Sequence, residues 1–215
     1  MQMKIRRPVA EDIPFLGWVM FTAARSHLPQ CPWSVIFGET ETGTRDLLER
    51  VAQNPVPHWC HASKFWIAEV DEKPAAAMCG FVPETEGTRV LAEAAFDIAA
   101  RDLGYSKERL AEIGERLEIA MSGLPDDLPE VWGVENVAVL PEFRGKGLID
   151  SLFEKVLEEG RGKGFERVQI LCLIGNEPGQ RAWERNGFEV LTQKTSPAFD
   201  KLIGTPGAKL LVQNL

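Results

Sequence analysis

The sequence predicts an α/β fold that is built on one mixed β-sheet. Strand-length apolar segments alternate with helical patterns in the C-terminal half, which favours parallel pairing. A β-hairpin in the N-terminal half adds antiparallel strands, so the sheet is expected to be mixed. The chain has 215 residues, 44% of them hydrophobic and 26% charged. This length and composition predict one domain, 1–215, with a full hydrophobic core.

The N-terminal third is expected to begin with a short strand that Pro8 ends. Thr44 is the expected cap of the second helix. The hairpin is joined by the turn residues 71–74. The expected elements are, in order, a strand over 3–7, a helix over 10–25, a loop over 26–41, a helix over 44–53, and hairpin strands over 64–70 and 75–82.

Composition argues against several classes of function. No segment approaches the ~20 consecutive apolar residues of a membrane span. The net charge of −8 removes the electrostatic attraction on which nucleic-acid binding depends. The basic N-terminus and the apolar run after it imitate a signal peptide, but Glu11 and Asp12 interrupt the pattern, so we expect an amphipathic helix. Four scattered cysteines favour a reducing, cytoplasmic setting.

Residues 84–130 form a segment of different composition. It is expected to hold two helices, near 88–102 and 106–121. Twelve acidic and five basic residues give it a net charge of −7, which is most of the excess charge of the chain. Either these acidic side chains form a solvated helical face, or the segment is an acidic lid that selects a cationic substrate.

The C-terminal half alternates between strands and helices. Leu148, Leu152 and Val156 belong to one apolar stripe of the first helix there. The expected elements are a strand over 131–139, a helix over 148–159, a strand over 165–173, a short helix over 178–186, and strands over 188–193 and 208–213.

The tetrapeptide Arg-Gly-Lys-Gly occurs twice, at 144–147 and at 161–164. The first copy follows a strand and opens a helix, where free N–H groups and the helix dipole attract anions. Glycines there let an anion approach the backbone closely. The first copy therefore predicts a pyrophosphate cradle. The second copy follows a helix, where the N–H groups are already used, and is interpreted as structural.

The stretch from Asn136 to Leu148, Asn-Val-Ala-Val-Leu-Pro-Glu-Phe-Arg-Gly-Lys-Gly-Leu, resembles the acetyl-CoA motif of the GNAT N-acetyltransferase superfamily. A second matching stretch comprises Ile170-Leu-Cys-Leu173, Asn176 and Ala182-Trp-Glu-Arg-Asn-Gly-Phe188. The resemblance is strong over 131–190 and does not cover 84–130, where the family has a shorter connection.

The resemblance implies a mostly antiparallel sheet with helices on both faces and a splayed central parallel pair, 131–139 and 165–173. Acetyl-CoA would lie in the splay as a co-substrate, and its acetyl group would pass directly to an amine. The resemblance implies cofactor-binding roles for Val137, Ala138, Val139, Arg144, Gly145, Lys146, Gly147, Leu148, Ile149, Asn176 and Trp183.

Direct transfer needs a base for the amine and a donor for the carbonyl oxygen that gains charge. The resemblance assigns the base to Glu135 and the donor to the N–H of Val139. A surface carboxylate is the alternative interpretation of Glu135, with Asp97, Glu93 or a water as the base.

Several positions depart from the family pattern. Glu142 replaces the usual Arg or Gln, and Ile149 stands where a third glycine is frequent. Asp150 would repel a phosphate, so its side chain is expected to point away from the loop.

Trp183 stands where many members have the tyrosine that protonates the leaving thiolate, and indole N–H cannot supply that proton. Tyr105, the only tyrosine, lies in the insertion. The sequence therefore leaves two functions open. They are an acyl-CoA-dependent N-acetyltransferase for a small-molecule or peptide amine, and an acyl-CoA-binding regulatory module without turnover.

Two further hypotheses concern other segments. The His58-Trp-Cys-His61 run does not match a zinc spacing, so no metal site is expected. The helices of 84–130 are candidates for a homodimer interface or for a cap over the acceptor site.

Overall fold

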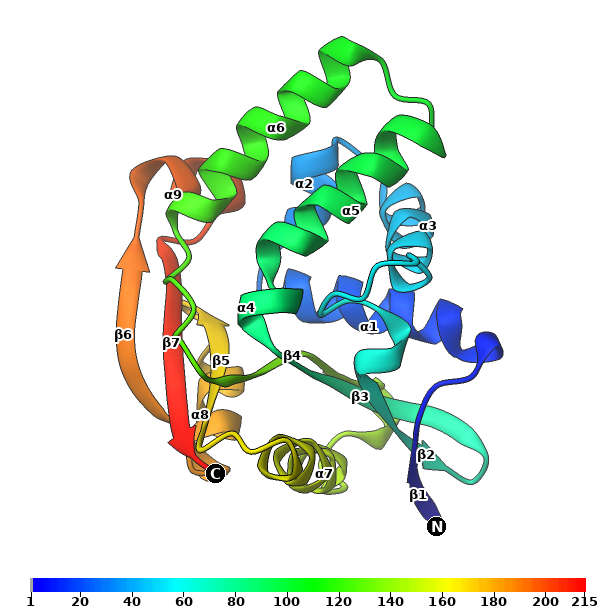
Figure 1. Cartoon of the computed structure of the whole chain (residues 1–215), viewed down its shortest axis with the longest axis vertical. Helices are drawn as coiled ribbons and strands as arrows, with labels where there is room; N and C mark the ends of the chain where they lie inside the picture. The colour runs from blue at the N-terminus through cyan, green and yellow to red at the C-terminus, as the bar shows by residue number, and fades with distance from the viewer. Residues whose placement is uncertain (1) are drawn as a thin grey trace.

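A computed structural model describes residues 2–215 as one seven-stranded mixed sheet with helices on both faces (Figure 1). The strand order is β1-β2-β3-β4-β5-β7-β6, and only the central β4–β5 pair is parallel among these strands. The expected splayed sheet is thus confirmed. The strands are β1 (Met3–Arg6), β2 (Phe65–Val70), β3 (Lys73–Phe81), β4 (Trp132–Val139), β5 (Arg167–Leu173), β6 (Glu189–Thr195) and β7 (Gly207–Asn214).

Nine α-helices and three short 3₁₀ turns connect the strands in residues 2–215. The helices are α1 (Ile13–Arg25), α2 (Pro32–Phe37), α3 (Glu41–Ala52), α4 (Pro83–Glu86), α5 (Thr88–Arg101), α6 (Lys107–Ser122), α7 (Leu148–Gly162), α8 (Glu177–Arg185) and α9 (Pro197–Ile203). The 3₁₀ turns are η1 (Ala10–Asp12), η2 (Ala62–Lys64) and η3 (Pro141–Phe143).

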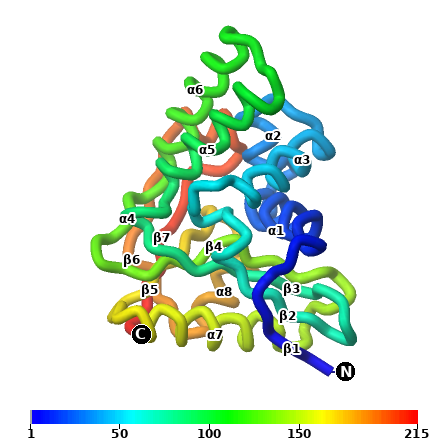
Figure 2. The backbone as a smooth tube through the Cα atoms, turned by 45° about the vertical axis from the view of Figure 1, so that its right-hand side comes forward, coloured from blue at the N-terminus to red at the C-terminus, as the bar shows by residue number. Residues whose placement is uncertain are grey.

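The helices divide into two layers because the two sheet faces bury different side chains. The apolar stripe of α7, including Leu152 and Val156, packs with Trp132 and Val168 against one face, and α8 lies on the same side. Helices α1, α2, α3, α5 and α6 contribute to a second core on the opposite face, around Phe65 of β2. Figure 2 shows the two layers from another side.

Two expectations for the N-terminal third are wrong. Residues 26–41 are not a loop throughout, because α2 lies within them, with proline at its first position and Gly38 in the left-handed conformation at its end. The cap of α3 is Thr40, whose hydroxyl accepts the N–H of Gly43. Thr44 is buried one turn later, and its hydroxyl is hydrogen-bonded to Ser34 at 2.7 Å.

The segment 84–130 contains α5 and α6, as expected, and most of α4. Its apolar residues, including Leu91, Ile98 and Ile113, pack inward against the second core. The acidic residues of α5 and α6 are exposed on the outer face. Outside these two helices, Glu86 forms an ion pair with Lys64, and Asp127 accepts a hydrogen bond from Gln169 of β5. The acidic side chains of α5 and α6 therefore form a solvated face of this segment.

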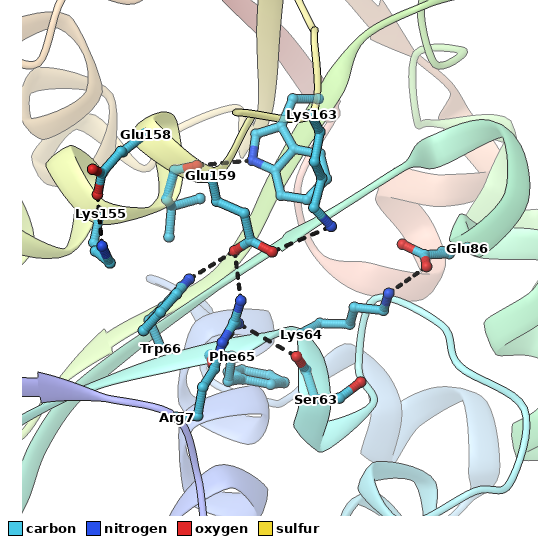
Figure 3. Close-up of polar contacts among 12 residues, drawn as sticks. Arg7, Ser63, Lys64, Phe65, Trp66, Glu86, Lys155, Glu158, Glu159 and Lys163 are labelled. Carbon is cyan, nitrogen blue, oxygen red and sulfur yellow. Dashed lines mark hydrogen bonds and ion pairs between the residues drawn. The ribbon is translucent and has the colours of Figure 1, made fainter. Parts of the chain in front are cut away.

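Glu159 ties the C-terminal end of α7 to the edge of the sheet (Figure 3). Its carboxylate accepts the indole N–H of Trp66 at 2.7 Å and forms ion pairs with Arg7 at 2.9 Å and Lys163 at 3.2 Å. Trp66 belongs to β2 and Arg7 follows β1, so this cluster fixes α7 against both strands.

No helix within residues 2–215 is long and apolar enough to cross a membrane. The four cysteines, Cys31, Cys60, Cys79 and Cys172, are free thiols and all are buried.

Candidate active site

The parallel strands β4 and β5 separate near the centre of the sheet. Their pairing begins at Trp132 and ends at Val134 and Ile170, although both strands continue. Beyond that point the edge of β4 that faces β5 has no partner strand among the described residues. This opening is the place where an extended ligand can bind as an additional strand.

A β-bulge at Asn136 accompanies the separation. The register between β3 and β4 shifts at this point, and Asn136 adopts a left-handed φ of 54°. Asn tolerates this conformation better than most residues. Its buried side-chain amide donates to the thiols of Cys60 and Cys79, and these two contacts stabilise the bulge.

Beyond the bulge, every second residue of β4 directs its backbone N–H toward the opening. The N–H of Leu140 donates to the carbonyl of Ala75 at 2.9 Å, on the β3 side. Because N–H groups of successive strand residues point to opposite edges, those of Val139 and Val137 are directed to the open side. Ala138 lies between them, paired with Ala77.

Glu135 lies where the two strands part. Its carboxylate accepts the backbone N–H of Leu171 at 3.0 Å, so the side chain bridges β4 and β5 at the fork. Burial raises the pKa of Glu135 to about 8, against the opposing effect of the Leu171 hydrogen bond. A carboxylate with a pKa near neutrality is suited to take up and release a proton.

The first Arg-Gly-Lys-Gly copy forms the turn from η3 into α7. Gly145 and Gly147 have φ values of 72° and 75°, and a Cβ at either would meet no other described atom within 4 Å. Gly147 is the N-cap of α7, and no side chain caps the helix. The Lys146 ammonium lies 4.7 Å from the centre of the Phe143 ring. The loop thus offers open backbone and positive charge to an anion.

The second copy closes the same helix. The N–H of Gly164 donates to the carbonyl of Arg161 at 2.9 Å, and the N–H of Phe165 to that of Gly160 at 3.1 Å. These two bonds are the Schellman motif, with Gly164 in the left-handed position at a φ of 88°. Lys163 packs over the Trp132 ring at 4.8 Å. The second copy ends a helix and has the structural role that the sequence suggested.

Helix α8 contributes two residues to the opening. Asn176 is its N-cap, and its side-chain oxygen accepts the N–H of Gly179 at 3.1 Å, so only its amide nitrogen remains for a ligand. Trp183 packs edge-on against Phe153 of α7, with ring centres 5.5 Å apart. Its indole N–H is buried close to the thiol of Cys172, a weak acceptor, and has no nitrogen or oxygen partner among the described residues.

A cleft of about 330 Å³ runs through this opening and continues beneath α5 and α6. We call it the splay cleft. Its near part is lined by Glu135, Val137, Cys172, Asn176 and Trp183. Its far part is lined by side chains from α1, α2, α5, α6 and α9, together with Trp59.

The residues considered as an alternative proton donor or base, Tyr105, Glu93 and Asp97, do not line the splay cleft. Tyr105 donates its hydroxyl to Glu39 and stacks on Arg109, and it does not line the cleft. Glu93 and Asp97 are exposed on α5, where each forms an ion pair one turn away along the helix.

Asp150 accepts hydrogen bonds from Arg185 and Asn186 at the end of α8. Its side chain therefore points away from the glycine loop. Within residues 2–215 no three His, Cys, Asp or Glu side chains gather as a metal site.

Sequence reasoning missed much of the far part of the cleft. Phe199 and Ile203 come from α9, which was not expected, although Ser196 followed by proline is an N-terminal helix signal. Trp33 and Ile36 come from α2, which carries a similar signal in Pro32.

The chain matches the model of the acetyltransferase (GNAT) family over residues 33–188. No curated protein sequence matches the chain. Among solved structures it is similar to a protein described as an acetyltransferase (TM-score 0.70, 16% identity, 98% of each chain covered). It is also similar to an N-acetyltransferase from Staphylococcus aureus Mu50 (TM-score 0.69, 16% identity, 97% of this chain and 99% of that one).

A further structural relative is the N-acetylglutamate synthase from Neisseria gonorrhoeae, in complex with coenzyme A and N-acetyl-glutamate. The TM-score is 0.51 at 15% identity, over 100% of this chain and 35% of that one. At these identities the structural likeness establishes the fold alone.

Proposed function

Because the chain belongs to the GNAT acetyltransferase family, we propose that it transfers the acetyl group of acetyl-CoA directly to an amine. The observation that carries the proposal is the position of Glu135 at the fork of β4 and β5, inside the splay cleft. The open strand edge and the glycine loop supply binding groups at the two ends that an extended thioester ligand needs.

Each binding group has a proposed partner on the co-substrate. The outward backbone groups of Val137 and Val139 pair with the pantetheine amides. The loop 144–149 holds the pyrophosphate, with charge from Arg144 and Lys146. The free amide nitrogen of Asn176 and the buried indole N–H of Trp183 are donors in the same cleft.

In the proposed reaction Glu135 takes a proton from the incoming amine, which attacks only when neutral. The amine nitrogen bonds to the thioester carbon and the carbon–sulfur bond breaks. The N–H of Val139 donates to the carbonyl oxygen as that oxygen gains charge. Trp183 gives no proton at neutral pH, so the second proton, which the nitrogen loses as it becomes an amide, passes through water to the leaving thiolate. The products are the amide and the free thiol.

The acyl-CoA-binding module without turnover is the second candidate. Trp183 favours it, because the indole occupies the position of a proton donor and cannot act as one. The two candidates predict the same binding and differ only in thiol release. Calorimetric titration with acetyl-CoA, with ATP as control, and an assay for released thiol over an amine panel separate them.

We expect Glu135→Gln to lower kcat by about 10²–10⁴-fold and to leave the affinity for acetyl-CoA unchanged. Glutamine keeps an oxygen for the Leu171 N–H, so the fold is preserved. A base must be ionised, so the wild-type kcat/KM should rise with pH and level off above the Glu135 pKa of about 8. This rise should be absent in the variant.

Glu154→Gln, on the exposed face of α7, is the matched control and should behave as wild type. Two amines of different pKa distinguish ionisation of the enzyme from that of the substrate. An unchanged kcat in Glu135→Gln would refute the role of Glu135. Acetyl-CoA binding without thiol release for any amine would favour the binding module.

A further inference from the structure

The far part of the splay cleft is an apolar chamber. It lies between the bulge in β4 and the inner faces of α5 and α6, and α2 and α9 close its sides. Its principal walls are the side chains of Trp33, Ile36, Leu91, Leu117, Phe199 and Ile203. The chamber is continuous with the position of Glu135, so a molecule inside it can present one end to that carboxylate.

The splay cleft has one charged side chain in its lining, and it lies where the chamber meets the fork of β4 and β5. Glu135 is the only residue with an ionisable carboxylate or cationic side chain among the described residues that line the splay cleft. The acidic residues Glu108, Glu112 and Glu115 of α6 are exposed, and helical spacing puts them on the side of that helix away from Leu117 and Met121. A second ammonium group in the chamber would lose its hydration without gaining a counter-charge. This disfavours diamines and other polycations.

Two tryptophans give the chamber flat, fixed walls. Trp33 stacks on Phe37 with ring centres 5.7 Å apart, and Trp59 stacks on Phe81 at 5.6 Å. The backbone N–H of Trp59 donates to Glu86 at 2.9 Å, which anchors the segment. The two rings therefore present apolar surface against which a flat group can pack.

The splay cleft is partly open to solvent, so its volume describes the part of a ligand that it can enclose. The whole splay cleft measures about 330 Å³, at the lower end of small-molecule pockets, which span roughly 300–1,000 Å³. The acetyl-bearing end of the co-substrate takes part of this space. What remains suits a body of about one ring.

Resting on the proposed function, we propose that the acceptor is a primary amine on a small apolar body, such as a single aromatic ring. The amino group lies at Glu135 and the body fills the apolar chamber, where the insertion helices α5 and α6 form the wall that selects it. The insertion thus acts as a substrate-selecting wall through its apolar inner face rather than through its acidic outer face.

The test compares three amines with acetyl-CoA and the full-length protein, using released thiol as the readout. They are 2-phenylethylamine, 1,4-diaminobutane and ethanolamine. We expect kcat/KM to be at least about tenfold higher for the aromatic amine than for either of the others. Higher kcat/KM for the diamine or ethanolamine would overturn the inference and leave the proposed function intact.

A second comparison asks whether the chamber takes an acyl chain instead. With ethanolamine as acceptor, kcat/KM is measured separately for acetyl-CoA and for octanoyl-CoA. Preference for octanoyl-CoA would place the chain in the chamber and overturn the inference. If acetyl-CoA binds and no amine releases thiol, the proposed function fails and the inference fails with it.

Met121→Glu probes the chamber directly. Met121 lines the splay cleft at the end of α6 and is 43% exposed, so the variant should fold. We expect the added carboxylate to lower kcat/KM for 2-phenylethylamine and to raise it for 1,4-diaminobutane. Glu115→Gln, at an exposed position on the outer face of α6, is the matched control and should change neither. Unchanged selectivity in a folded Met121→Glu protein that still binds acetyl-CoA would overturn the inference.

Discussion

The two Arg-Gly-Lys-Gly copies stand at the two ends of one helix, α7. At 144–147 the glycines lie before the first turn, where N–H groups are free and the dipole is positive. At 161–164 the same residues lie at the last turn, where the chain's own N–H groups bond the final carbonyls. An identical tetrapeptide therefore forms an open loop with free N–H groups at one end and a closed cap at the other. Helix polarity decides the difference.

The largest expected loss of acetyl-CoA affinity comes from adding a side chain to a glycine of the first copy. Gly147→Val places a branched side chain at a φ of 75° where, in the proposed complex, a phosphate approaches the backbone. We expect acetyl-CoA to bind about 100-fold more weakly, or ~2.8 kcal/mol, by calorimetry. Near wild-type affinity in the folded variant would show that both copies are structural.

A smaller difference in acetyl-CoA affinity is expected between variants of Lys146, in the first copy, and Lys163, in the second. Lys146→Ala removes a charge beside the proposed pyrophosphate, and we expect about tenfold weaker acetyl-CoA binding with a weaker dependence on salt. Lys163→Ala is the counterpart in the second copy. It removes contacts to Glu159 and Trp132 and should leave the affinity unchanged. Equal losses of affinity in both variants would contradict the comparison.

The smallest effect concerns stability alone. Gly164→Ala forces a side chain into the left-handed position of the Schellman motif, and we expect unfolding to become easier by about 1 kcal/mol in chemical denaturation. Gly162→Ala, two residues earlier in helical backbone, should instead stabilise by about 0.5–1 kcal/mol. Acetyl-CoA affinity should be the same in both. A change in affinity would mean that the second copy reaches the ligand.

Much of the fold could be predicted because its signals are local and repeated. The stripe of α7 and the hairpin of β2 and β3 each extend over enough residues to show their period. The order of strand, glycine turn and helix around Gly145 and Gly147 indicated the loop, and its binding of a pyrophosphate stays a prediction. The splay itself came from the family resemblance, because no residue pattern shows where two strands stop pairing.

The remaining errors have physical causes. Helices α2 and α9 have six and seven residues, too few for a helical period to be visible. Thr40 and Thr44 are equally good caps as residue types, and only the burial of Thr44 beside Ser34 excludes it. The walls of the apolar chamber come from five helices that are distant in sequence, so the acceptor site could not be assembled without the tertiary structure.

The burial of all four thiols has a practical consequence for assays. Thiol reagents react with thiolates, and burial raises the pKa of Cys31 and Cys172 to about 11 and that of Cys60 to about 12. Three of the thiols lie outside the splay cleft, and Cys172, which lines it, is only 4% exposed. The folded protein should therefore react slowly with a colorimetric disulfide reagent, and that reagent would count the thiol released in each proposed turnover. When a molecule unfolds, its four cysteines become reactive together. One reagent thus reads catalysis in the native protein and loss of structure in a damaged one.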